Sequence, residues 1–86
     1  MYEVGLVPGA KAVYEAADRP LAVKLSRCLA RLESNPRDGN NVKRLAGDWS
    51  GYWRYRVGDW RVIYRIDDRA RRVYIVAIAH RRDVYE

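Results

Sequence analysis

The chain has 86 residues, of which 49% are hydrophobic, so we expect a single folded domain over residues 1–86 whose function lies on a surface or in a shallow groove. Seventeen Lys and Arg residues against eleven Asp and Glu give a net charge of +6, which favours a polyanionic partner, either nucleic acid or an acidic protein. The single cysteine and single histidine exclude an intrachain disulfide and leave no ligand set for a structural zinc site.

The N-terminal part predicts one strand and two helices. Residues Tyr2–Val7 show the partial alternation of a short strand, which a proline and a glycine then break. Apolar side chains recur at spacings of three and four over residues 10–18, which predicts a short helix. Asp18 is the expected N-cap of a second helix with Pro20 in its first turn.

The second helix has an apolar stripe at helical spacing. The stripe consists of Leu21, Leu25, Cys28, Leu29 and Leu32. The helix should end near Pro36, because the residue before a proline disfavours helical geometry. Within this stripe Cys28 is expected to be a small core residue and not a nucleophile.

The C-terminal half predicts a sheet. A polar loop at 37–41 and a connector at 42–49 lead into it. Three strands follow, at residues 52–57, 60–67 and 72–80. The order is therefore β-α-α-β-β-β, an α+β fold in which a helical pair packs on one face of an antiparallel sheet.

Gly58-Asp59 is a two-residue hairpin signal, and such a turn fixes the register of its strands. The expected pairs are Val57 with Trp60, Arg56 with Arg61, Tyr55 with Val62, and Arg54 with Ile63. Because side chains alternate between faces, one face is apolar and should pack on the helices. It carries Trp53, Tyr55, Val57, Trp60, Val62 and Tyr64. The other face carries Arg54, Arg56, Arg61 and Arg65, with Tyr52 and Ile63 among them.

Four arginines on one sheet face predict an anion site. Like charges directly across a strand pair are destabilising, so the arrangement is costly without a counter-charge. Guanidinium is planar, permanently charged and suited to phosphate oxygens, and nearby aromatic rings can stack on unpaired bases. A solvated basic face paired with Asp67, Asp83 or Glu86 is the alternative. The charge favours phosphate binding, because residues 41–86 hold eleven basic and six acidic side chains, whereas residues 1–40 hold six and five.

The C-terminal tail adds further candidates. If the third predicted strand pairs with the second, His80 should lie near Arg61 and bring Arg81 and Tyr85 to the rim of the arginine face. Histidine can donate or accept a proton near neutral pH, which arginine cannot readily do. A structural histidine is the alternative interpretation.

Two segments, KRLAGDWSGYWRYRVGDWRVIYRIDD and VYIVAIAHRRDVY, resemble the RelE/ParE superfamily of bacterial toxins. The resemblance spans Lys43 to Tyr85, about half of the chain. Its RelE branch implies a metal-independent, cofactor-free endoribonuclease that enters the ribosomal A site and cuts mRNA. The 2′-OH of the RNA is the nucleophile and a 2′,3′-cyclic phosphate is the product. A cognate antitoxin, held in a toxin–antitoxin hetero-oligomer, is the implied protein partner.

The resemblance also implies roles for individual residues. Arg61 matches a strand arginine that contacts the scissile phosphate, and Arg54 and Arg56 match basic residues, often lysines, of the substrate groove. Arg81 matches a residue that stabilises the leaving group or transition state, and Tyr85 one that orients or stacks on the base. Because arginine is a poor general base, that role would pass to His80, or catalysis would depend on electrostatic stabilisation. Further RNA contacts are expected from Lys43, Arg44, Arg65 and Arg82.

Two other functions stay open at this point. One is a ParE-like poison of DNA gyrase, which shares the fold but has few of the basic residues, and the other is a non-catalytic module that binds an antitoxin. We expect a cytoplasmic protein without a signal peptide or membrane span, because the sequence has neither a leader pattern nor an apolar run of about 18 residues.

Overall fold

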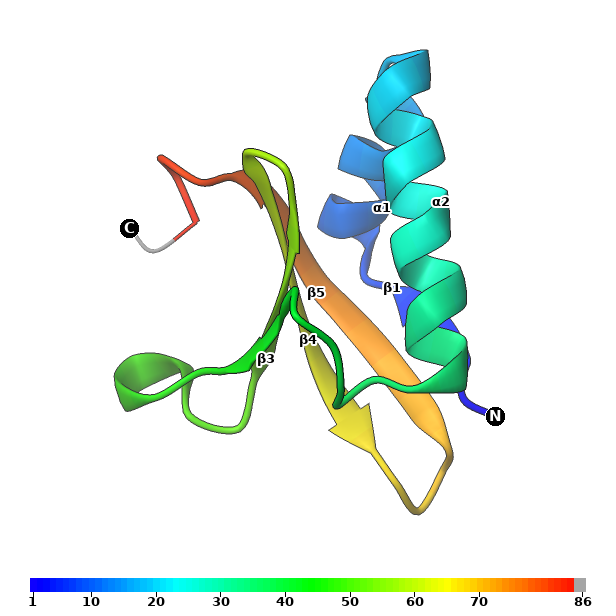
Figure 1. Cartoon of the computed structure of the whole chain (residues 1–86), viewed down its shortest axis with the longest axis vertical. Coiled ribbons are helices and arrows are strands. Elements are labelled where there is room, and N and C mark those ends of the chain that lie inside the picture. Colours follow the sequence, from blue (N-terminus) through cyan, green and yellow to red (C-terminus); the bar gives the residue numbers. More distant parts are fainter. Residues whose placement is uncertain (85–86) are drawn as a thin grey trace.

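The computed structural model describes residues 1–84 and shows two helices packed on one side of a five-stranded sheet (Figure 1). The elements in chain order are β1 (Glu3–Leu6), α1 (Pro8–Ala16), α2 (Arg19–Ser34), β2 (Val42–Arg44), the 3-10 turn η1 (Gly47–Trp49), β3 (Trp53–Val57), β4 (Trp60–Asp67) and β5 (Arg72–His80). Residues 81–84, which follow β5, turn to the side of the sheet away from the helices, which we call the outer face (Figure 1).

The helix boundaries follow from local chemistry. Helix α1 begins at Pro8, where a break was predicted, because proline lacks only a donor that the first turn leaves unused. The predicted cap of α2 is confirmed, since the Leu21 amide donates to Oδ1 of Asp18 at 3.0 Å. The helix ends at Ser34, immediately before Asn35 and the buried Pro36.

The strand order is β1-β5-β4-β3-β2, and the predicted α+β arrangement is confirmed. In detail the sheet is mixed and not wholly antiparallel, because β1 pairs parallel with β5. This pairing joins the first and the last strand of the chain, so no local turn signal in the sequence predicts it. The segment predicted as a connector contains β2, which pairs with β3 at the edge of the sheet.

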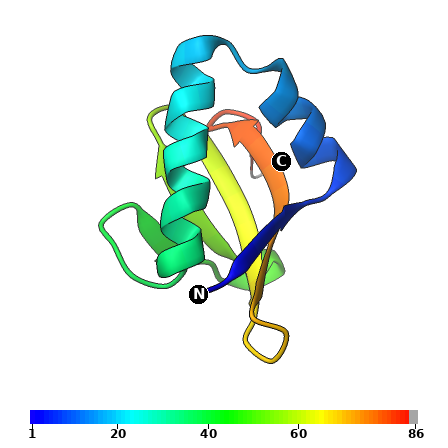
Figure 2. The same ribbon diagram turned by 90° about the vertical axis from the view of Figure 1, so that its right-hand side faces the viewer.

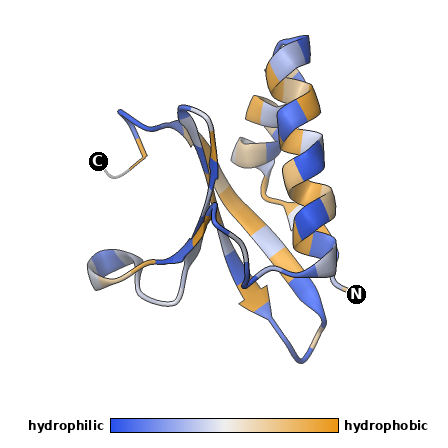
Figure 3. Ribbon diagram, in the orientation of Figure 1, coloured by the Kyte–Doolittle hydropathy of each residue, from blue (hydrophilic) through white to orange (hydrophobic). Residues whose placement is uncertain are grey.

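The predicted hairpin register is confirmed at all four pairs, including Arg56 opposite Arg61. The apolar face of the hairpin also packs as predicted, since Tyr55, Val62 and Tyr64 belong to the core beneath the helices. Viewed from the helix side, α2 crosses the sheet and α1 covers its β5 end (Figure 2). Helix α2 shows alternating apolar and polar bands in Figure 3, as expected of a helix with one buried side.

A β-bulge divides strand β5 into two halves. Tyr64 of β4 pairs with Ile75, but Ile63 pairs with Ala77, so Val76 is the extra residue. An extra residue reverses the facing of every side chain beyond it. The bulge therefore brings Ile78 into the core beneath the helices and turns Ala77 to the outer face.

A second, smaller packed region lies on the outer face. Ile63 is fully buried and alternates with the core residues Val62 and Tyr64, so its side chain points away from the helices. Val84, in the tail, is 6% exposed and also lies outside the main core cluster. Val84 is therefore packed against the rest of the molecule. Within residues 1–84, neither helix has the length and apolar character needed to cross a membrane.

Candidate functional site

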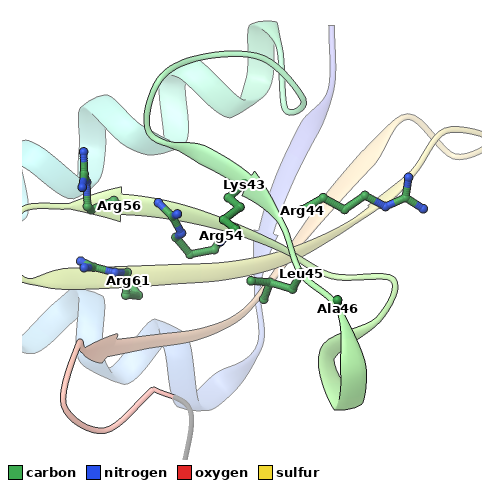
Figure 4. A pocket seen from close by; sticks show the side chains of 7 residues that line it. All are labelled: Lys43, Arg44, Leu45, Ala46, Arg54, Arg56 and Arg61. Atoms are coloured by element: carbon green, nitrogen blue, oxygen red, sulfur yellow. The ribbon is translucent and has the colours of Figure 1, made fainter.

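Three predicted arginines meet in one hollow on the outer face. Arg54 and Arg56 leave β3 two residues apart, and Arg61 leaves β4 directly opposite Arg56 (Figure 4). The hollow has a volume of about 430 Å³ and is open to solvent. Its lining, which we call the basic groove, consists of Lys43, Arg44, Leu45, Ala46, Arg54, Arg56 and Arg61.

The basic groove has no acidic residue in its lining. Within residues 1–84 the ion pairs are Arg37–Asp68, Arg72–Glu3 and Arg81–Asp59, and none of them includes a groove cation. The described residues therefore do not support the alternative in which each arginine of this face is paired with a carboxylate. The groove collects positive charge that a bound anion would neutralise.

Backbone carbonyls hold two of the three guanidinium groups. Arg54 donates to the carbonyl of Asn41 at 3.2 Å. Arg61 donates to the carbonyls of Gly58 and Trp60 at 2.8 and 2.9 Å, at the turn of the hairpin. Each bond occupies one terminal nitrogen of a group that has five N–H donors, so donors remain for a ligand. These bonds position the charges before a ligand arrives.

Small residues form the neighbouring part of the outer face. Because of the bulge, Ala79 is the partner of Arg61 and Ala77 is the partner of Ile63. Without it, larger side chains of β5, among them Ile78, would face outward at this level. The bulge thus leaves space beside Arg61.

The same bulge overturns the placement expected for His80. His80 pairs with Trp60, and both side chains face the helices, on the opposite side of the sheet from Arg61. The two rings meet edge to face, with centroids 5.8 Å apart. Nδ1 of His80 accepts the Arg82 amide at 3.3 Å. His80 therefore lines a different pocket, next to Asp18 of the helical pair, and not the basic groove.

Arg81 lies near the hairpin turn but outside the groove lining. The Arg81 amide donates to the Asp59 carbonyl at 2.7 Å, and its guanidinium lies 3.7 Å from the Asp59 carboxylate. Both side chains are exposed, so this pair is weak and can be exchanged for another anion. Arg82 is exposed, and the expected role of Tyr85 lies outside the described residues.

The four expected RNA contacts divide between different surfaces. Lys43 pairs with Arg54 across β2 and β3 and lies inside the groove. Arg44 belongs to the groove lining, but its guanidinium points away from those of the other groove arginines (Figure 4) and lies 5.9 Å from the Trp53 ring centroid. Arg65 stacks on Tyr74 at 4.3 Å and does not line the groove.

Sequence reasoning missed the wall that Leu45 and Ala46 contribute. These residues follow β2, a three-residue strand inside the predicted connector. Val42, Lys43 and Arg44 show no strict alternation of apolar and polar residues, and a strand of three residues is too short to give a clear pattern. The Leu45 amide donates to the Tyr52 carbonyl at 3.0 Å, which continues the pairing toward η1.

Cys28 is buried in the core, as predicted. Burial raises the pKa of its thiol to about 12, so the sulfur stays protonated at neutral pH and is a poor nucleophile. In the part of the chain covered by residues 1–84, no three His, Cys, Asp or Glu side chains are grouped closely enough to hold a metal ion.

Comparison with known families decides the relationship. The sequence model described as "ParE toxin of type II toxin-antitoxin system, parDE" matches residues 10–85. The chain belongs to the ParE toxin family. It is also 36% identical over 55 residues to the toxin YoeB of Mycobacterium bovis, a match that covers 62% of this chain and 65% of that protein.

Solved structures of the wider superfamily share the fold. The YoeB/ParE toxin from Agrobacterium tumefaciens superposes with a TM-score of 0.82 at 20% identity, covering 91% of this chain and 96% of that one. A chain of the RelBE2 toxin–antitoxin complex from Mycobacterium tuberculosis superposes with a TM-score of 0.77 at 28% identity, covering 92% and 96%. The resemblance to the RelE/ParE superfamily noted from the sequence is thereby confirmed.

Proposed function

We propose that this chain is the toxin of a type II toxin–antitoxin system and acts as a ribosome-dependent, metal-independent mRNA endonuclease. The observation that supports this most directly is the basic groove, in which Arg54, Arg56 and Arg61 converge from two adjacent strands without a lining carboxylate. Single-stranded RNA supplies the missing negative charge and fits an open groove.

The groove suits a phosphodiester whose negative charge increases during reaction. Attack of the ribose 2′-oxygen on phosphorus forms a pentacoordinate centre with additional charge on its oxygens. Arg61, fixed at the hairpin turn, and Arg54, fixed at Asn41, place donors toward that charge without reorganisation. A donor preorganised in this way contributes roughly 3 kcal/mol to transition-state stabilisation in other enzymes.

Proton transfer then needs a group other than arginine or His80. Lys43 is the groove residue whose nitrogen can lose a proton, because guanidinium stays protonated. In this mechanism the Lys43 amine accepts the 2′-OH proton while the 2′-oxygen forms its bond to phosphorus. The bond from phosphorus to the 5′-oxygen breaks, that oxygen takes a proton from water, and the products are a 2′,3′-cyclic phosphate and a 5′-hydroxyl.

The ribosome supplies what a shallow groove cannot. Cleavage by the 2′-OH requires an in-line arrangement of attacking oxygen, phosphorus and leaving oxygen, and holding reactants in such a geometry provides a large part of a rate enhancement. An open hollow on a protein this small restrains few nucleotides. We therefore assign the orientation of the mRNA to the ribosomal A site and the charge stabilisation to the basic groove.

An antitoxin is the second proposed partner. Membership of the ParE toxin family and the likeness to a chain of the RelBE2 toxin–antitoxin complex support it. The net charge of +6 favours an acidic binding segment. Such a segment would cover the basic groove within a cytoplasmic hetero-oligomer and exclude RNA from it.

The test is to add the purified protein to a translating extract and to map mRNA ends by primer extension. We expect cuts within translated codons that depend on ribosomes and carry cyclic phosphate ends. Arg61→Ala should reduce the cleavage rate at least 100-fold, in line with the loss of one preorganised donor. Arg69→Ala, at an exposed turn, is the matched control and should cleave normally.

A gyrase poison is the second candidate, and the match to the ParE toxin model favours it. It predicts DNA breaks with gyrase trapped at their ends and intact mRNA. Growth arrest with trapped gyrase and no mRNA ends would select this function. Induction without growth arrest would instead leave a non-catalytic antitoxin-binding module.

A further inference from the structure

A second basic hollow lies around the end of β3 and shares Arg56 with the groove lining. It has a volume of about 260 Å³ and we call it the edge pocket. Its lining consists of Lys24, Arg27, Cys28, Asn41, Tyr55, Arg56, Val57 and Gly58. It joins the exposed side of α2 to the part of β3 that extends beyond β2.

Two kinds of surface meet in the edge pocket. Its floor is apolar and buried, since Cys28, Tyr55 and Val57 are 1%, 8% and 7% exposed. Its rim carries Lys24 and Arg27 from successive turns of α2, and neither belongs to an ion pair within residues 1–84. An apolar, partly aromatic floor with a cationic rim matches a nucleotide, which has a flat base and a charged phosphate.

Arg56 connects the two hollows. It lines both the basic groove and the edge pocket, and it is exposed. The Arg56 amide donates to the Asn41 carbonyl at 2.9 Å, so its backbone is fixed where β2 begins. One arginine therefore stands at the passage from the outer face of the sheet to α2.

We propose that the edge pocket is a second RNA subsite, in which the strand bound in the basic groove passes Arg56 and places a further nucleotide on Lys24 and Arg27. This inference rests on the proposed function for the identity of the polymer. RNA accounts for both hollows with one ligand, because a continuous phosphodiester backbone carries charge along its whole length. An acidic peptide bound at the edge pocket alone would not require continuity through Arg56.

The experiment measures binding of 2′-O-methyl RNA, which cannot be cleaved, by fluorescence anisotropy over a range of salt concentrations. Two lengths are compared, a dinucleotide and an oligonucleotide of about ten nucleotides, which lies within the site sizes of single-strand binders. The variant is Lys24→Gln/Arg27→Gln. The matched control is Lys11→Gln/Arg69→Gln, which removes one lysine and one arginine from exposed positions outside both hollows.

For the long RNA, the slope of log K against log salt should become shallower by about 0.7 in the edge-pocket variant, since the further nucleotide brings one phosphate and each phosphate contact on single strands accounts for about 0.7. The control should keep the wild-type slope, and dinucleotide binding should be equal in all three proteins. Equal slopes for the variant and the control with long RNA would overturn the inference. The inference would also be overturned if the edge-pocket variant lost as much slope with the dinucleotide as with the long RNA. It would equally be overturned if the wild-type protein bound an acidic peptide but neither of the two RNAs.

Failure of the proposed function is separately visible. If the wild-type protein cuts no mRNA but the edge-pocket variant shows the length-dependent change in slope, the second subsite stands and the nuclease mechanism is rejected. If the wild-type protein cuts mRNA but the variant and the control bind long RNA with the same salt slope, the proposed nuclease function stands and the second subsite is rejected.

Discussion

Arg56 and Arg61 are directly opposed across the β3–β4 hairpin, with their side chains on the same outer face of the sheet. Directly opposed like charges destabilise a strand pair, so folding stability and anion binding compete at this position. Arg56→Gln should raise the free energy of unfolding by roughly 0.2–1 kcal/mol at low salt. Urea denaturation at low and high salt checks this, because salt screens the repulsion and should shrink the difference. Lower stability of Arg56→Gln at low salt would contradict it.

Lys43 lies opposite Arg54 in the groove and is the proposed proton acceptor. Lys43→Arg should keep the charge and the affinity for uncleavable RNA but reduce single-turnover cleavage by about 100-fold or more, the usual contribution of a positioned base. His80→Gln should cleave at nearly the wild-type rate, since His80 faces the helices. Normal cleavage by Lys43→Arg would remove lysine from the mechanism.

A carboxylate outside the groove joins the turn between β4 and β5 to the N-terminal segment and to the loop after α2. Asp68 accepts two hydrogen bonds from Arg37 at 2.7 and 2.9 Å and one from the Tyr2 hydroxyl at 2.6 Å. These donors, Arg37 first, hold the pKa of Asp68 below its usual value. The stabilisation is therefore complete above the unfolded pKa of about 3.9 and is lost as pH falls through the lower folded pKa.

Asp68→Asn should accordingly be less stable than wild type at neutral pH, and the two proteins should converge in acid. Denaturant midpoints measured between neutral and strongly acidic pH check this. Asp38→Asn is the control, because Asp38 is exposed and its carboxylate accepts a hydrogen bond from the side chain of Asn35, not from an arginine. If the difference in denaturant midpoint between wild type and Asp68→Asn grew toward low pH, the sign of the pKa shift would be contradicted.

Tyr64 ties the sheet to the loop after α2. It is fully buried, and its hydroxyl donates to the Pro36 carbonyl at 2.6 Å. Burial, the main cause, raises its pKa, so the hydroxyl stays a donor at ordinary pH. Tyr64→Phe should lower the free energy of unfolding by about 1–3 kcal/mol, because a buried carbonyl is left without its partner. A loss below a few tenths of a kcal/mol would show that this bond does not stabilise the loop.

The parts of this fold that local patterns specify were predictable from the sequence. The two-residue turn Gly58-Asp59 fixed the pairing of four residues on each side, and Asp18 marked the start of α2. The shared face of Arg54, Arg56 and Arg61 follows from that register. The family resemblance located the same residues independently.

What the sequence did not show depends on contacts between distant segments. The bulge at Val76 has no clear local signal in an apolar strand, yet it decides which face His80 occupies. The parallel pairing of β1 with β5 and the short strand β2 likewise depend on partners elsewhere in the chain. Prediction therefore placed Arg54, Arg56 and Arg61 correctly, but it placed Arg65 in the same cluster and His80 on the wrong face.

The central claim is that guanidinium groups from adjacent strands bind the RNA backbone in the basic groove. The most direct measurement is a titration of the ¹⁵Nε–¹H signals of the arginine side chains with uncleavable 2′-O-methyl RNA. We predict saturable shifts of Arg54, Arg56 and Arg61 with one dissociation constant, while Arg69 and Arg72 stay unchanged. Shifts spread evenly over all exposed arginines, or confined to those outside the groove, would contradict the account.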